Sequence, residues 1–205
     1  MALFRLTKIV EPEPVLRGDG LYLRPAGIAD YAAWVRLRAE SRDFLTPWEP
    51  RWPADDLTRS AFRRRIARQD RERLDDLAYS FMIFRAADDT LLGGATLGNV
   101  RRGVAQCATL GYWMGAPHAG QGWMAKAVPC LLRHAFIDMR LHRIEAACAP
   151  QNERSSRLLE RLGFQREGFA RAYLCINGDW RDHYLFGLLE GDATRSQAQM
   201  GGKVG

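Results

Sequence analysis

The feature that most constrains the fold of this chain is a strand, a glycine-rich turn and a helix that follow one another in its middle. Residues 109–114 are apolar and aromatic, and Gly111 among them predicts a strand with a bulge. A loop of small residues follows over 115–122, and apolar residues from 123 to 139 recur at helical spacing, as on a helix packed against a core. The start of such a helix presents unpaired N–H groups and the positive end of the helix dipole, so this stretch predicts a phosphate site.

The same glycines are compatible with other sites. Residues 120–125 (GQGWMA) satisfy the dinucleotide-binding pattern G-x-G-x-x-G/A, but in that fold the first glycine follows its strand almost directly, whereas five residues separate Met114 from Gly120. The acidic residue expected about twenty positions later would be Glu145, which lies inside the next strand pattern. The P-loop spacing G-x-x-x-x-G-K-[ST] is absent. A dinucleotide site is therefore disfavoured, and glycines that merely turn the chain remain an alternative.

Composition restricts the classes of protein to consider. A chain of 205 residues fits one domain. It has neither a run of about eighteen apolar residues nor a signal-peptide pattern, so we expect a cytoplasmic protein. The net charge of +6 is carried mostly by arginine, which fits a phosphorylated ligand or an RNA-rich partner but also simple coding bias. The widely spaced cysteines predict buried thiols rather than a disulfide framework or a metal site; they are Cys107, Cys130, Cys148 and Cys175.

The remaining patterns predict an α+β domain built on one mixed, mostly antiparallel sheet of six to seven strands flanked by helices. Residues 1–19 are expected as an N-terminal arm and 191–205 as a disordered tail, which leaves 20–190 for the domain. Asp30 is expected to cap a first helix, an aspartate at 55 or 56 to start a second that reaches 73, and Asn152 to cap one that ends at 162. Strands are expected at 21–25, 79–86, 91–100, 104–114, 143–149, 164–176 and 179–189, the last two joined by Asn177-Gly178.

Four motifs follow one another between residues 21 and 189. They are 44–50 (FLTPWEP), 110–112 (LGY) with 120–124 (GQGWM), 142–144 (HRI) with 150–155 (PQNERS), and 162–168 (LGFQREG) with 177–183 (NGDWRDH). This ordered set resembles the Gcn5-related N-acetyltransferase (GNAT) family, and within it the RimJ type, the ribosomal-protein-alanine N-acetyltransferases.

The resemblance implies the GNAT fold, with a splayed central cleft in the sheet and acetyl-CoA as the cosubstrate. It implies direct attack on the thioester by the α-amine of a protein N-terminus that begins with Ala or Ser, with a ribosomal protein as the partner. No metal, membrane or direct nucleic-acid contact is required, and the oligomeric state, monomer or dimer, stays open. The residues agree with this acceptor, because an α-amine has a pKa of ~7.7–8.0 and needs less help than a lysine near ~10.4 from a chain without an obvious strong base.

The resemblance also implies where the cosubstrate lies. The loop x-G-x-G-x-[GAM] holds the diphosphate, the preceding strand pairs with the pantetheine arm, and an amide near the Gly111 bulge polarises the thioester carbonyl. Ala119 stands where many members carry Arg or Gln, so one side-chain phosphate contact is missing. The expected cofactor-binding residues are Tyr112, Trp113, Met114, Ala119, Gly120, Gln121, Gly122, Trp123, Met124, Ala125 and Asn152, the last of which also caps its helix.

Ser155 is the catalytic residue that the resemblance implies, as the acid toward the leaving thiolate, although a plain surface serine is an equal alternative. Many other GNAT enzymes carry a tyrosine acid at the position of Leu159, which leaves that role to Ser155 or water. Some close relatives carry a carboxylate at the position of Leu174, so no base is assigned, and Glu49, Glu145 and Asp182 are the candidates. The expected acceptor-binding residues are Trp48, Glu49, Tyr173, Asp182 and His183, with structural roles in a lid or in the hairpin core as the alternative for the aromatic ones.

Two further functions stay open. A GNAT enzyme for a small amine, such as a polyamine or an aminoglycoside, would need an acidic acceptor pocket. A ribosome- or RNA-associated protein that keeps the fold without turnover is allowed by the arginine-rich helix expected over 57–73, although a charge run on a helix is more often a solvated face.

Overall fold

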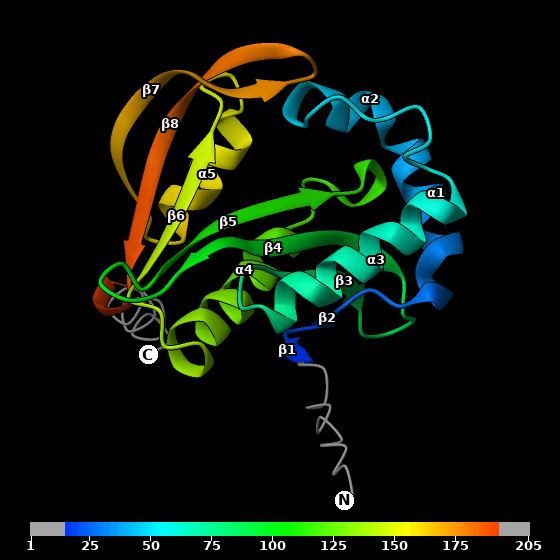
Figure 1. Cartoon of the computed structure of the whole chain (residues 1–205), viewed down its shortest axis with the longest axis horizontal. Coiled ribbons are helices and arrows are strands. Elements are labelled where there is room, and N and C mark those ends of the chain that lie inside the picture. Colours follow the sequence, from blue (N-terminus) through cyan, green and yellow to red (C-terminus); the bar gives the residue numbers. More distant parts are fainter. Residues whose placement is uncertain (1–14, 193–205) are drawn as a thin grey trace, which may run out of the picture.

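Strand β3 (Tyr79–Arg85) shows how the sheet is used in the computed structural model, which describes residues 15–192. Side chains alternate along a strand, and here Phe81 and Ile83 pack in one buried cluster while Met82 and Phe84 pack in another. The sheet therefore lies between two layers of helices, as Figure 1 shows. Residues 1–14 and 193–205, which make up most of the expected arm and tail, lie outside the described residues.

The strands of the described residues form one sheet of eight in the order β1-β2-β3-β4-β5-β6-β8-β7. Only β5 and β6 pair in parallel, so the predicted mixed, mostly antiparallel sheet is confirmed. The strand beyond the expected number is β1, which pairs with β2 inside the segment expected as an arm. The other bounds are β1 (Leu16–Gly18), β2 (Leu21–Arg24), β4 (Leu91–Arg101), β5 (Cys107–Met114), β6 (Arg143–Cys148), β7 (Gln165–Ile176) and β8 (Asp179–Leu189).

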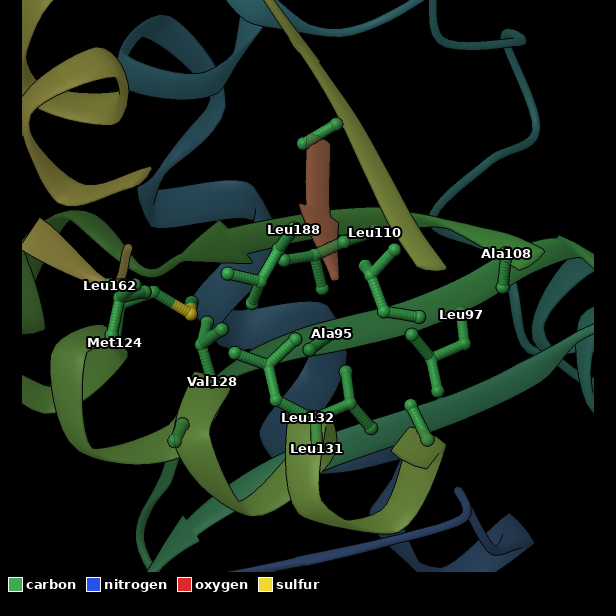
Figure 2. Packing of buried hydrophobic residues seen from close by; sticks show 14 of the residues in the cluster. Ala95, Leu97, Ala108, Leu110, Met124, Val128, Leu131, Leu132, Leu162 and Leu188 are labelled. Atoms are coloured by element: carbon green, nitrogen blue, oxygen red, sulfur yellow. The ribbon is translucent and has the colours of Figure 1, made fainter. Parts of the chain in front are cut away.

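Helix α4 (Trp123–Arg133) covers one face of the sheet. Figure 2 shows Val128 and Leu131 of this helix in the same apolar packing as Leu97 and Leu110 of the sheet. Each buried leucine or valine contributes roughly 1.5–3 kcal/mol of transfer free energy, so this cluster holds the helix against the strands. Because α4 is fixed in this way, the loop that precedes it is fixed too.

Helices α1 (Tyr31–Glu40) and α3 (Arg59–Leu74) cover the other face. Trp34 of α1 and Phe62 of α3 are buried with their ring centroids 4.8 Å apart, and both pack with Phe84 of the sheet. The remaining helical elements are α2 (Arg42–Leu45), α5 (Glu153–Arg161), the short 3₁₀ turns η1 (Ile28–Asp30), η2 (Thr46–Trp48) and η3 (Ala116–His118), and the π-helical turn η4 (His134–Asp138) that continues α4.

The helix caps agree with the sequence in part. Asn152 caps α5, because its Oδ1 accepts a hydrogen bond from the Ser155 amide at 3.2 Å. The second long helix begins after Thr58, whose Oγ1 accepts from the Ala61 amide, so the expected aspartate cap was wrong. Asp30 precedes α1 but makes no side-chain cap bond. The three aspartates instead form ion pairs, Asp30 with Arg24, Asp55 with Arg64 and Asp56 with Arg65.

The bulge predicted at Gly111 is not there. The β4–β5 ladder is regular from the pair Gly93–Met114 to the pair Gly98–Thr109, and its irregularity lies between Gly98 and Arg101 on β4. Asn99 in that stretch has a φ of +50°, so β4 and not β5 absorbs the extra residue. Gly111 instead lies just beyond the point where β5 leaves β6.

The sheet splits between β5 and β6, as the resemblance implied. The two strands pair through only three residues, from Cys107 with Arg143 to Thr109 with Glu145. Beyond Thr109, β5 continues along β4 while β6 continues along β8, and Figure 1 shows the two strands diverging from their shared end. The edge of β5 that faces β6 therefore has no strand partner beyond Thr109 among the described residues.

Candidate active site

A pocket of about 200 Å³ lies where β5 and β6 diverge. It has walls from both halves of the sheet, a floor from α5, and one side from the β7–β8 hairpin and the turn η2. Sequence reasoning anticipated Trp48, Tyr112, Asn152, Ser155 and His183 of its lining. Gly111, beside which an amide was expected to polarise the thioester carbonyl, also lines the pocket. Sequence reasoning did not assign the apolar and small residues around them, and the run of small residues that ends β6 was the available signal for four of these: Ala146, Ala147, Cys148 and Ala149, with Leu110, Leu159 and Ile176 as the others.

The glycine loop lies between the end of β5 and the start of α4. Gly120 and Gly122 have φ values of +76° and +82°, in the left-handed region that favours glycine. A Cβ built on either residue would meet no atom within 4 Å, so the space over the loop is open. The side-chain amide of Gln121 closes the loop: its nitrogen donates to the Pro117 carbonyl at 2.8 Å, and its oxygen accepts from the Trp123 indole at 3.2 Å.

The start of α4 suits an anion. The first-turn amides of a helix have no intrahelical acceptor, and the helix dipole adds positive potential at the same place. Gly122 occupies the cap position without a side chain, so nothing of its own covers these amides. Met124 is a buried core residue, and Trp123 and Ala125 pack against the same core, so these three residues present backbone rather than side chains to the space over the loop. Ala119 has only a methyl group to offer.

Tyr112 and Ser155 meet across the pocket. The Tyr112 hydroxyl of β5 lies 2.7 Å from Ser155 Oγ in the first turn of α5. Burial raises the pKa of Tyr112 to about 12, although the Ser155 hydroxyl next to it lowers that pKa somewhat. The serine is therefore part of the pocket wall and is held at two points: its hydroxyl is bonded to the Tyr112 hydroxyl, and its backbone amide donates to Asn152 Oδ1.

The neighbouring strand residues divide between the two faces of β5. Tyr112 and Met114 pack against the cluster under α4, whereas Trp113 packs against the cluster under α1 and α3. Only Tyr112 of these three lines the pocket with its side chain. What Trp113 and Met114 offer to a ligand on this edge is backbone.

The acceptor-side residues expected from sequence are only partly brought together. Trp48 and His183 line the pocket, and His183 is 4% exposed with its Nδ1 3.0 Å from the Arg181 carbonyl oxygen. Because that oxygen can only accept, Nδ1 carries the proton. Tyr173 is exposed outside the pocket and packs edge-on against His183, with ring centroids 5.9 Å apart. Asp182 accepts from the Ala172 amide at 2.7 Å, where β7 is irregular.

Glu49 is held by partners that sequence reasoning missed. Its two oxygens accept from the two terminal nitrogens of Arg38, each at 2.7 Å, and one also accepts from the Trp52 indole. The buried Arg38 guanidinium lies over the Trp52 ring at 4.0 Å and over the Trp113 ring at 5.0 Å. The available signal was an arginine at helical spacing within the apolar stripe of α1.

The Glu49 backbone joins this cluster to the acceptor side. Its carbonyl oxygen accepts from the Asn177 amide at the tip of the β7–β8 hairpin, at 2.9 Å. The loop after α2 and the hairpin are therefore tied together beside the pocket. Among residues 15–192, no group of His, Cys, Asp and Glu side chains is placed to hold a metal ion, and no helix is long and apolar enough to cross a membrane.

Comparisons with known proteins agree with this geometry. The family described as Acetyltransferase (GNAT) domain matches residues 20–165. The probable N-acetyltransferase YjcK of Bacillus subtilis is 39% identical over 179 residues, which cover 87% of this chain and 98% of that protein. The ribosomal protein uS5-alanine N-acetyltransferase of Escherichia coli is 37% identical over 185 residues, covering 89% and 94%. The structure of Mycobacterium smegmatis RimJ in complex with CoA-disulfide superposes with a TM-score of 0.83 at 31% identity, covering 92% and 94%.

Proposed function

The chain belongs to the GNAT family and is an acetyl-CoA-dependent N-acetyltransferase, and from this premise we propose that its acceptor is the α-amine of a protein N-terminus. We propose further that the physiological acceptor is a ribosomal protein that begins with Ala or Ser. The name of the Escherichia coli relative, a ribosomal protein uS5-alanine N-acetyltransferase, supports this acceptor class.

The observation that carries the proposal is the neutral lining of the pocket. Within the described part of the chain, its walls contain apolar, hydroxyl, amide and imidazole groups and no Asp or Glu. A polyamine keeps several positive charges at neutral pH and would need carboxylates to replace its water. An α-amine with a pKa of ~7.7–8.0 is already partly neutral at pH 7.5, so it can enter without them. The neutral pocket therefore favours an N-terminus over a small polycation.

The glycine loop and β5 fit the cosubstrate. In this proposal the backbone amides between Gly120 and the first turn of α4, which face open space, hold the diphosphate. The edge of β5 beyond Thr109, which has no strand partner there among the described residues, pairs in this proposal with the amides of the pantetheine arm, as it would with an added strand. When bound, acetyl-CoA supplies the acetyl group as a thioester. A Cβ built on Gly111 meets no atom within 4 Å, so the thioester carbonyl has room beside a backbone amide of β5.

In this proposal Ser155 donates a proton to the sulfur that leaves, because it lines the pocket and its hydroxyl is held there. Asn152 positions the first turn that carries this serine. Trp48 and His183 form the wall beside the incoming amine. The contacts expected from Glu49, Tyr173 and Asp182 to the acceptor stay predictions, since these residues surround the pocket without lining it.

The test is release of coenzyme A from acetyl-CoA with peptides that begin with a free Ala, Ser or Met. Controls are the same peptides with a blocked N-terminus and an internal lysine, and spermidine. We expect turnover only with free N-termini, fastest with Ala or Ser. Turnover with spermidine alone would assign the chain to the small-amine enzymes. Binding of coenzyme A without turnover of any acceptor would leave a fold that binds and does not catalyse.

A further inference from the structure

Among residues 15–192, the two halves of the pocket are joined through side chains by the hydrogen bond between Tyr112 and Ser155. The residues are 43 positions apart in sequence and come from β5 and α5, on opposite sides of the split in the sheet. Their oxygens are 2.7 Å apart, which is an ordinary length for a hydroxyl pair. The Tyr112 ring packs against the cluster under α4, so the position of its hydroxyl is set by the core.

The distance alone allows either hydroxyl to donate, and their chemistry favours Tyr112 as the donor. A phenol is the stronger acid and hence the better donor, whereas a serine oxygen has two lone pairs to accept with. Burial raises the pKa of Tyr112 to about 12, so the phenol keeps its proton throughout the neutral range. With Tyr112 as donor, the serine proton is free to point elsewhere. In the described part of the chain, no other side chain is bonded to Ser155 Oγ.

We propose that Tyr112 is a positioning residue for Ser155. Its O–H donates to Ser155 Oγ and thereby directs the serine proton into the pocket, toward the sulfur of the departing coenzyme A. This inference rests on the proposed function for the identity of the acceptor, but the hydroxyl pair itself does not depend on which amine attacks.

The step balances without any further reactant. The amine nitrogen forms a bond to the acetyl carbon, and the bond from that carbon to sulfur breaks with its electron pair on sulfur. Ser155 Oγ gives its proton to the sulfur, and the proton that the nitrogen loses restores the serine. Tyr112 keeps its own proton throughout, so it acts on the orientation of Ser155 and not as an acid.

The experiment is a double-mutant cycle with Tyr112→Phe and Ser155→Ala. Phenylalanine keeps the ring packing and removes only the donor. We expect Ser155→Ala to lower kcat by about a hundredfold, as for loss of a general acid, and Tyr112→Phe to lower it by about tenfold, as for loss of one hydrogen bond. KM for acetyl-CoA should stay within about twofold of the wild type, since neither hydroxyl is assigned to its binding. The double variant should be no slower than Ser155→Ala, because Tyr112 acts only through the serine.

A matched control is Tyr22→Phe on β2, which removes a hydroxyl that donates to Asp89 in the turn between β3 and β4 and should leave kcat unchanged. Wild-type kcat in Tyr112→Phe, or losses that multiply in the double variant, would overturn the proposal. If the wild type acetylates spermidine instead of N-termini, the proposed function fails, and the same cycle run with spermidine still decides the role of Tyr112.

A structural measurement tests the proposal even where no acceptor is turned over. In high-resolution crystal structures with coenzyme A bound, we expect the Ser155 side chain to occupy one rotamer in the wild type and more than one in Tyr112→Phe. An unchanged single rotamer would show that Tyr112 does not orient the serine. This readout stands even if no acceptor is found.

Discussion

At the scale of single residues, the contacts that organise the site are long-range and involve groups that do not react. Arg38 of α1 comes 11 positions before Glu49, yet it binds the carboxylate of that residue and stacks on Trp113 of β5. A guanidinium suits this place because its planar fork binds a carboxylate in two points while its face meets an aromatic ring. Arg38 thus joins a helix, a loop and a strand beside the pocket.

Replacing Arg38 tests this role. Arg38→Ala leaves the Glu49 carboxylate largely buried without its main partner, and we expect a loss of about 3 kcal/mol in the free energy of unfolding, measured with urea. Arg38→Lys should lose less, because it keeps the charge but not the fork or the stacking. Arg157→Ala removes an exposed ion pair on α5 and should change stability little. Equal effects of Arg38→Ala and Arg157→Ala would show that the buried cluster contributes no special stability.

At the scale of elements, the loop between β5 and α4 is shaped by backbone conformation rather than by side chains. Two left-handed glycines turn the chain so that the start of α4 faces open space. Replacing a left-handed glycine elsewhere in the chain by a larger residue would cost about the same unfolding free energy, but that residue would not face the ligand. This difference allows backbone strain to be separated from ligand binding.

Gly122→Ala and Gly103→Ala form such a matched pair. Both residues have positive φ with no atom within 4 Å of a built Cβ, but Gly103 lies in the turn before β5, away from the glycine loop. We expect each to cost about 1 kcal/mol of unfolding free energy. Only Gly122→Ala should raise KM for acetyl-CoA, by about tenfold or ~1.4 kcal/mol, because the added methyl group occupies the space over the glycine loop. A KM unchanged in Gly122→Ala would remove the loop from the diphosphate site.

Elements with a local signal were predicted well. Asn177 and Gly178 both adopt positive φ, as the predicted two-residue hairpin requires, and Asn152 is the cap that its helix needed. The strand β1 was missed because three residues carry too little alternation to be recognised. The bulge was placed at Gly111 because glycine often marks one, whereas the extra residue is Asn99, whose side chain tolerates the left-handed region.

The parts of the site that depend on distant pairs were not predictable from local pattern. The spacing of the glycines indicated the phosphate site at the glycine loop, and the resemblance indicated Ser155 and Asn152. Nothing near Tyr112 in the sequence indicates that its hydroxyl meets a serine 43 positions later. Likewise, Glu49 was expected to be free for the acceptor, whereas its oxygens already accept from Arg38 and Trp52. Such pairs are set by how β5 and β6 separate, which no single window of sequence contains.

At the scale of the whole molecule, the two halves of the sheet meet directly through the short β5–β6 ladder, and the pocket opens beyond it. A ligand seated on the glycine loop and along β5 adds contacts that the unfolded chain lacks. Coenzyme A should therefore stabilise the fold by mass action, with ~2.7 kcal/mol at a hundred times its Kd. For a chain of this size that corresponds to a rise in Tm of roughly 5–10 °C.

The rise in Tm separates the contributions of the ligand's parts. Pantetheine has the arm without the diphosphate, so at the same concentration it should raise Tm far less than coenzyme A if the helix-start amides carry much of the binding. Gly122→Ala should reduce the coenzyme A shift, whereas Gly103→Ala should keep it at the wild-type size although both variants start from a lower Tm. Equal shifts for pantetheine and coenzyme A would place the binding free energy on β5 alone and leave the glycine loop as a turn.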